Sequence, residues 1–334
     1  MLFRNSFRLL TENFKNVYKI LLYQILVAIV ALALYSVLIL PEFTQIWNNA
    51  VTVELRAALG KFFDAFFSAN GHELTLIKEQ IFSAGGLLQR FGELLVSKLT
   101  PIIFTALGCV LVHLLKRFAE TLCFFAVGSA LSDKMSTYAE TPLFGSYVAN
   151  LGKASVYALV YVPVVFAFDL LTIVAVIFLM STLDLFPALF LSVTLVVVCQ
   201  AFKLTFTGLW MPAMTADKKR LRDAFKYENK TEKKQRRKIF ANYIVTVYAV
   251  IILNLAAALF TFGSALLITI PASFMLFICQ QYVNYYTIKG KKYFITYETI
   301  ATNPDYGDKE HFFDYIDETA TVKFDNKETK ENQE

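Results

Sequence analysis

The sequence contains few of the residues that build disulfide frameworks and metal sites. It has four cysteines, none in a C-x-x-C pair and each within an apolar stretch: Cys109, Cys123, Cys199 and Cys279. This pattern excludes a disulfide-rich fold and a zinc module, and it predicts small buried side chains. His113 has no second ligand at metal-binding spacing, and His311 with Asp314 and Asp317 makes an incomplete set. We therefore expect no metal site.

Motifs of the common enzyme classes are also missing. The chain has no Walker A loop for nucleotides, no nucleophile elbow and no H-E-x-x-H helix. We therefore predict a non-enzymatic protein without a cofactor, because an enzyme here would need an intramembrane site that no motif marks.

Charge is scarce, and its distribution is uneven. Only 18% of residues are charged against 56% hydrophobic and 15% aromatic, and the mean hydropathy is +0.50. This balance is too apolar for a soluble domain of 334 residues, so the lipid bilayer is an expected partner. The net charge of +5 comes from basic residues that flank apolar runs, as the positive-inside rule requires. Nucleic-acid binding is therefore not expected.

Long apolar runs dominate what is present, and they predict an all-α polytopic bundle with about six spans. Each run approaches or exceeds the roughly 20 residues that cross the hydrocarbon of a bilayer. The first run is too long for a signal-peptide core, so we interpret it as a retained anchor that ends at Pro41. The expected spans are 17–40, 97–115, 154–180, 186–209, 240–260 and 263–287.

Shorter amphipathic segments are predicted to lie at the membrane surface. Residues 2–16 form one such helix, and 41–97 form two extracytoplasmic helices on the outer leaflet or against the bundle. Residues 118–132 are apolar but short, which favours an interfacial or re-entrant helix over a crossing. Thr141 is predicted to cap a further amphipathic helix, with Pro142 at its first position.

The loop 217–238 fixes the predicted orientation. It contains eleven lysines and arginines, so it is expected in the cytoplasm, and six crossings then place both termini there. The segment 288–334 is predicted to be a cytoplasmic tail with a strand-like start and a disordered end. The basic loop or the tail could dock a cytoplasmic protein or, for the loop, anionic lipid; the alternative is that the loop's charge serves topology alone.

One acidic residue is predicted to lie within a span. Asp169 would cost about 2.5 kcal/mol or more near mid-membrane, so a compensating partner is expected. Lys203 on the next span, with Gln200 one turn earlier, comes within reach because the two spans form a hairpin that turns near Asp184. Lys203 lies about 9 Å nearer the cytoplasm, a gap that a lysine stem can bridge. The pair is either an ion, proton or substrate site or a structural contact that fixes the hairpin.

Four amides are further candidates for polar contacts inside the membrane. Asn254 on the fifth span and Gln280, Gln281 and Asn284 on the sixth can hydrogen-bond between helices. The alternative is that these side chains near a cytoplasmic end simply meet water.

A faint internal repeat is visible in the order of the segments. Val17-Tyr18 and Val156-Tyr157 both stand between a surface helix and a long apolar run, and Asn242-Tyr243 marks a third copy. The repeat predicts three units, each of one surface helix and two spans; the alternative is a chance likeness of basic helices that precede apolar ones.

The first forty residues resemble the membrane modules of uncharacterised bacterial proteins, including those attached to some glycerophosphodiester phosphodiesterases. The resemblance is carried by Ser6-Phe7, Asn13-Phe14-Lys15 and the tyrosine-rich start of the first span. It implies a multi-pass protein of a bacterial plasma membrane. The catalytic domain of that family is absent, so no activity is implied. We expect an accessory or scaffold component, and the alternative is a transporter or permease subunit that uses Asp169 and Lys203.

Overall fold

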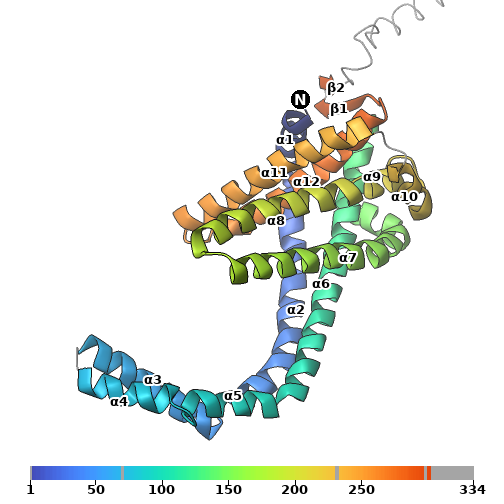
Figure 1. Cartoon of the computed structure of the whole chain (residues 1–334). Coiled ribbons are helices and arrows are strands. Elements are labelled where there is room, and N and C mark those ends of the chain that lie inside the picture. Colours follow the sequence, from blue (N-terminus) through green and yellow to red (C-terminus); the bar gives the residue numbers. More distant parts are fainter. Residues whose placement is uncertain (1, 69–70, 230–232, 297–298, 302–334) are drawn as a thin grey trace, which may run out of the picture. The chain divides into compact units, whose positions relative to one another are not determined.

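The computed structural model describes residues 2–68, 71–229, 233–296 and 299–301, and these residues are almost entirely helical (Figure 1). Within this part of the chain, six helical segments are long and apolar enough to cross a membrane: α2 (Lys15–Trp47), α6 (Leu99–Thr137), α7 (Leu143–Thr182), α8 (Leu185–Thr207) continued by α9 (Trp210–Thr215), α11 (Lys233–Phe260) and α12 (Leu266–Ile288). The predicted polytopic helical bundle is confirmed.

The chain forms two compact units, one of residues 1–21 with 122–334 and one of residues 22–121. In the first unit, neighbouring helices follow the order α7, α8, α11, α12 and then the amphipathic α1 (Leu2–Glu12). Figure 1 shows α7 beside α8 and α11 beside α12. The short α10 (Leu221–Asn229) packs on α9, where the rings of Phe225 and Trp210 are 4.2 Å apart.

Helix α12 is the core of this first unit. In its most apolar window 56% of residues are buried, against 6–22% in the other five candidate spans. Those other spans expose large apolar side chains such as Leu26, Phe178 and Phe190. Exposed apolar surface of this extent is stable only in lipid, so the five helices present a lipid-facing surface and α12 presents packing contacts.

The segment 118–132 is not the separate interfacial helix that the sequence predicted. It continues α6 without a break, and most of its residues are buried, with Phe125 and Val127 fully so. At helical rise the 39 residues of α6 amount to about 58 Å, far beyond the roughly 30 Å of hydrocarbon, so one continuous helix accommodates both segments. The charges at 116–120 that suggested a new helix instead pair along it, where Glu120 lies 3.6 Å from Lys116 and 3.8 Å from Arg117.

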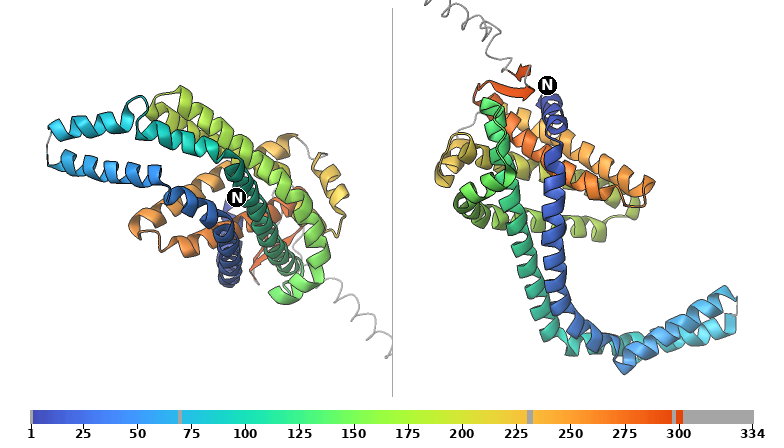
Figure 2. Two further views of the ribbon diagram at one scale, coloured as in Figure 1. Left: turned by 90° about the horizontal axis from the view of Figure 1, so that it is seen from below. Right: turned by 180° about the vertical axis from the view of Figure 1, so that it is seen from behind.

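The second unit contains three short helices where two were predicted. These are α3 (Ala50–Phe67), α4 (Gly71–Phe82) and α5 (Leu87–Ser97). Gly85 adopts a positive φ of 77° before α5, a conformation that glycine accepts without strain. Figure 2 shows α3 and α4 side by side. Together with α5 they share a small core of buried residues: Leu55, Ala58, Ala65, Ile77, Ile81 and Leu87.

The parts of α2 and α6 that belong to the second unit also pack on each other. The Tyr23 hydroxyl donates to the carbonyl of Ala119 at 3.0 Å. A Cβ atom placed on Gly108 would lie 3.1 Å from the Leu38 side chain, so this side chain packs against the backbone of α6. Small residues permit such approaches between membrane helices.

Two predicted helix boundaries are wrong. Pro41 does not end α2 but lies inside it, since a proline removes one backbone hydrogen bond without stopping a long helix. Thr141 does not cap α7, because its hydroxyl donates to Asp133 at 2.7 Å and Pro142 occupies the cap position. The described residues also lack a separate surface helix before the third span, because α7 runs unbroken over 40 residues. The second copy of the predicted repeat therefore lacks its surface helix.

The start of the predicted tail belongs to the bundle. After α12 the chain forms a two-stranded antiparallel sheet of β1 (Tyr293–Thr296) and β2 (Thr299–Ala301), where one strand was predicted. β1 packs on α1, and Asn5 donates to the Tyr293 hydroxyl at 3.1 Å. The predicted turn at 303–307, the helix near 311–316 and the disordered end lie outside the described residues.

Candidate functional site

The structure brings Asp169, Lys203 and Gln200 together between α7 and α8. Lys203 Nζ donates to Asp169 Oδ1 at 2.6 Å, and Gln200 Nε2 donates to the same oxygen at 3.1 Å. The Lys203 side chain is 11% exposed and that of Asp169 is 27% exposed. The contact predicted from the hairpin is therefore formed. The long side chain of Lys203 spans the predicted difference in position between Lys203 and Asp169 along the two helices.

Aromatic rings border this polar contact. Phe168 on α7 lies 6.0 Å from both Phe202 and Phe206 on α8, measured between ring centroids. Apolar surroundings strengthen an ion pair because the dielectric is low, and they penalise either charge alone. The arrangement can fix the register of the hairpin, and its carboxylate and ammonium groups can also contact an ion or a polar substrate. The sequence alone left both readings open.

Asn254 forms the predicted interhelical hydrogen bonds. Its amide nitrogen donates to Ser273 Oγ at 3.1 Å, and its carbonyl oxygen accepts from Thr269 Oγ1 at 2.8 Å. Both partners lie on α12, so these two bonds join α11 to α12.

The three amides near the end of α12 do not meet water, contrary to the alternative considered from the sequence. Gln280 is 0% exposed, Gln281 6% and Asn284 1%, because α1, α6, α9 and α11 surround this end of α12. Asn284 accepts from Asn242 on α11 at 3.3 Å. Within the described residues, the amide group of Gln280 and the Oε1 atom of Gln281 have no hydrogen-bond partner. Each buried polar group without a partner lowers the stability of the fold by about 1–3 kcal/mol. The polar side chains at this end of α12 are therefore buried at an energetic cost.

A carboxylate surrounded by lysines lies beyond the end of α12. Asp217 accepts from Lys291 at 2.6 Å and from the Tyr285 hydroxyl at 2.7 Å, and Lys219 and Lys289 lie at 3.5 and 3.8 Å. Burial acts to raise the pKa of Asp217, but the hydrogen bonds from Lys291 and Tyr285 outweigh it and lower the pKa. The cluster fastens the start of the basic loop to the chain after α12.

The lowered pKa of Asp217 predicts a pH dependence. Because the folded-state pKa lies below the ordinary value of 3.8, the contribution to stability is complete above that value and is lost as pH falls through the lowered pKa. Asp217→Asn should lower the thermal midpoint of the purified protein at pH 7, and the difference from wild type should shrink below about pH 4. The exposed Asp223→Asn is the control and should change neither value. A difference for Asp217→Asn that stays constant with pH would contradict the assignment.

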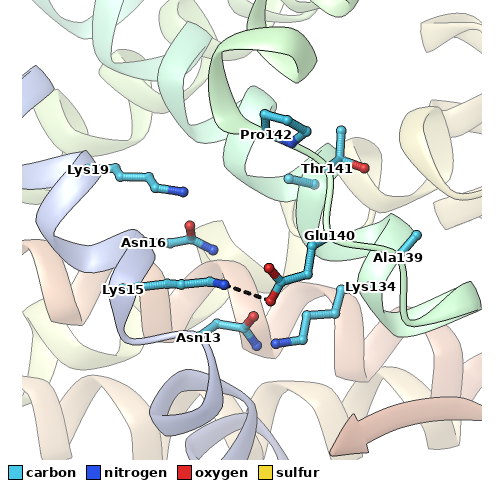
Figure 3. A pocket seen from close by; sticks show the side chains of 10 residues that line it. Asn13, Lys15, Asn16, Lys19, Lys134, Ala139, Glu140, Thr141 and Pro142 are labelled. Carbon is cyan, nitrogen blue, oxygen red and sulfur yellow. Dashed lines mark hydrogen bonds and ion pairs between the residues drawn. The ribbon is translucent and has the colours of Figure 1, made fainter. Parts of the chain in front are cut away.

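A cationic pocket of about 170 Å³ lies where α2 begins and α6 ends (Figure 3). It is lined by Asn13, Lys15, Asn16, Lys19, Ala130, Lys134, Ala139, Glu140, Thr141 and Pro142. Lys15 Nζ contacts Glu140 at 2.6 Å. The hydrogen bond and charge of Lys15, with smaller contributions from Lys134 and Lys19, lower the pKa of Glu140. Sequence reasoning missed this pocket because its lysines come from segments more than 100 residues apart.

Together these features define a class. Six apolar helical segments with few charges and with lipid-facing side chains make the chain a multi-pass integral membrane protein of the all-α class. No family model, curated protein or solved structure matches it. The resemblance of the first forty residues to bacterial membrane modules therefore stays a prediction.

Proposed function

We propose that the protein is a non-enzymatic accessory or scaffold component of a bacterial plasma membrane. The observation that carries the proposal is the tightly packed polar end of α12, where Gln280, Tyr282 and Tyr285 are fully buried. A helix end that is packed on all sides suits a fixed structural support better than a pathway along which a substrate moves. The amphipathic helices α3–α5, of which α3 exposes Phe63 and Phe66, would add contact with the bilayer surface.

The proposed orientation places both termini and the basic loop in the cytoplasm. Exposed cations at the start of α11 would then face a cytoplasmic protein partner or anionic headgroups. They are Lys233, Lys234, Arg237 and Lys238. Crosslinking in native membranes followed by purification tests this role, since a scaffold should carry a defined partner.

Two sets of charge-removing variants show whether the crosslinked partner binds at the start of α11. Replacing the four exposed α11 cations with glutamine should reduce the crosslinked partner at least tenfold while leaving abundance unchanged, because steering and docking by charge would be lost. Lys61→Gln with Lys78→Gln removes exposed charge from the second unit and should leave the partner in place. Equal recovery of the partner with all variants would contradict a docking role for this segment.

A second candidate function is a transporter or permease subunit, and the contact among Asp169, Lys203 and Gln200 favours it. An ionisable pair inside a span commonly marks an ion or substrate path. Purified protein in liposomes would report proton or cation flux with an internal dye. Flux that Asp169→Asn abolishes at unchanged protein level would favour transport; absence of flux above that of empty liposomes would favour the scaffold.

A further inference from the structure

The pocket at the start of α2 holds a buried lysine without a carboxylate partner. Lys134 is 8% exposed, and in the described part of the chain it forms no ion pair. Its ammonium lies 5.4 Å from the ring centroid of Tyr138, and its charge contributes only weakly to lowering the pKa of Glu140. The nearby Glu140 gives its hydrogen bond to Lys15 instead. An ammonium group is costly to bury unless an anion accompanies it, so the pocket lacks part of its negative charge.

The lining of the pocket is strongly cationic. Lys15, Lys19 and Lys134 against the single Glu140 give it a net charge of +2. Figure 3 shows the Lys15 and Lys19 side chains extending from α2 toward the segment that carries Glu140 and Thr141. Asn16 adds an amide to the lining, whereas the Thr141 hydroxyl already donates to Asp133. Several lysines with a neutral amide donor suit an anion with several oxygens, such as a phosphate.

The position of the pocket points to the headgroup layer of a membrane. Lys15 is the first residue of α2, Lys134 lies in the last turn of α6, and Pro142 caps the start of α7. Three candidate spans therefore begin or end around it. Basic pockets between the ends of membrane helices are where phosphate-bearing lipid headgroups bind.

We propose that this pocket binds a phosphate-bearing anion, with Lys134 as the buried counter-charge and Glu140 as a built-in competitor for Lys15. A lipid headgroup and free phosphate present the same group to these residues. The side chain of Glu140 is 63% exposed, so it can leave Lys15 at little cost when a phosphate enters. This site goes beyond the scaffold role, because a transporter could carry the same pocket.

The proposal is tested by titrating the purified full-length protein in neutral detergent with phosphatidylglycerol, with phosphatidylcholine and with inorganic phosphate. Native mass spectrometry counts bound lipid, and the thermal midpoint follows phosphate. Lys134→Gln should weaken binding about tenfold, because a charged hydrogen-bond donor is lost. Glu140→Gln should strengthen it about threefold, because the competitor is removed. Lys153→Gln removes an exposed charge from α7 and should have no effect.

Opposite signs for the variants at Lys134 and Glu140 distinguish the pocket from a general charge effect. If Lys134→Gln does not fold, the exposed Lys15→Gln replaces it and should also weaken binding. Preference for phosphatidylglycerol identifies a lipid headgroup, whereas the same variant pattern with inorganic phosphate alone identifies a free anion. Equal weakening by Lys134→Gln and Lys153→Gln, weaker binding by Glu140→Gln, or no binding of any probe would overturn the proposal.

Discussion

Asp169→Leu is expected to lower the free energy of unfolding by about 3–5 kcal/mol, the usual cost of removing one partner from a buried ion pair. The reason is that Lys203, only 11% exposed, would keep its charge without the oxygen that lies 2.6 Å away. Lys203→Met should cost less, because Asp169 is 27% exposed and keeps the hydrogen bond from Gln200. Unfolding in mixed micelles with increasing sodium dodecyl sulfate measures both values.

The double variant separates a coupled pair from two independent sites. Asp169→Leu with Lys203→Met removes both charges, so its stability should return to within about 1 kcal/mol of wild type. Val198→Leu, on an exposed part of α8, is the control and should lie within about 0.5 kcal/mol. If the two single losses simply added in the double variant, the contact would not hold the hairpin.

Gly128→Leu is expected to destabilise the first unit by about 1–3 kcal/mol or more through overpacking. A Cβ atom at this position of α6 would lie 2.7 Å from the Tyr282 hydroxyl and 3.0 Å from Met211. Tyr282 cannot retreat easily, since it is fully buried and its hydroxyl is 2.7 Å from Thr215 Oγ1. The close approach of α6, α9 and α12 therefore depends on a residue without a side chain.

Gly152 provides the matched control for Gly128. It lies in a helix as well, in α7, but a Cβ atom there would meet nothing within 4 Å. Gly152→Leu should therefore leave the thermal midpoint unchanged or raise it, because leucine favours a helix more than glycine does. Equal thermal midpoints for the two variants would show that α6 does not pack tightly on α12.

The sequence predicted the features that depend on neighbouring residues. The spans were predictable because a run of about 20 apolar residues has few stable structures other than a membrane-spanning helix. The contact between Asp169 and Lys203 was predictable because a short turn at Asp184 places the two helices side by side. The interhelical hydrogen bonds of Asn254 were predictable for the same reason, because a short turn also joins α11 to α12.

Other features depend on contacts that hydropathy does not encode. The continuity of α6 through Lys116 and Glu120 was missed because these charges looked like a membrane boundary, whereas in the structure they pair along one helix. Gln280 is buried on α12, a helix that packs against α1 from the other end of the chain. The cationic pocket needs Lys15 and Lys134 from distant segments, so no local pattern marks it.

The topology we propose has six spans with both termini in the cytoplasm. An impermeant maleimide applied to intact cells tests it, with single cysteines placed in a background that lacks the four native ones. The exposed Thr11, Ser83 and Ser264 suit this purpose. We expect labelling of Ser83→Cys and Ser264→Cys in intact cells, and of Thr11→Cys only after permeabilisation. Labelling of Thr11→Cys in intact cells would contradict the six-span account.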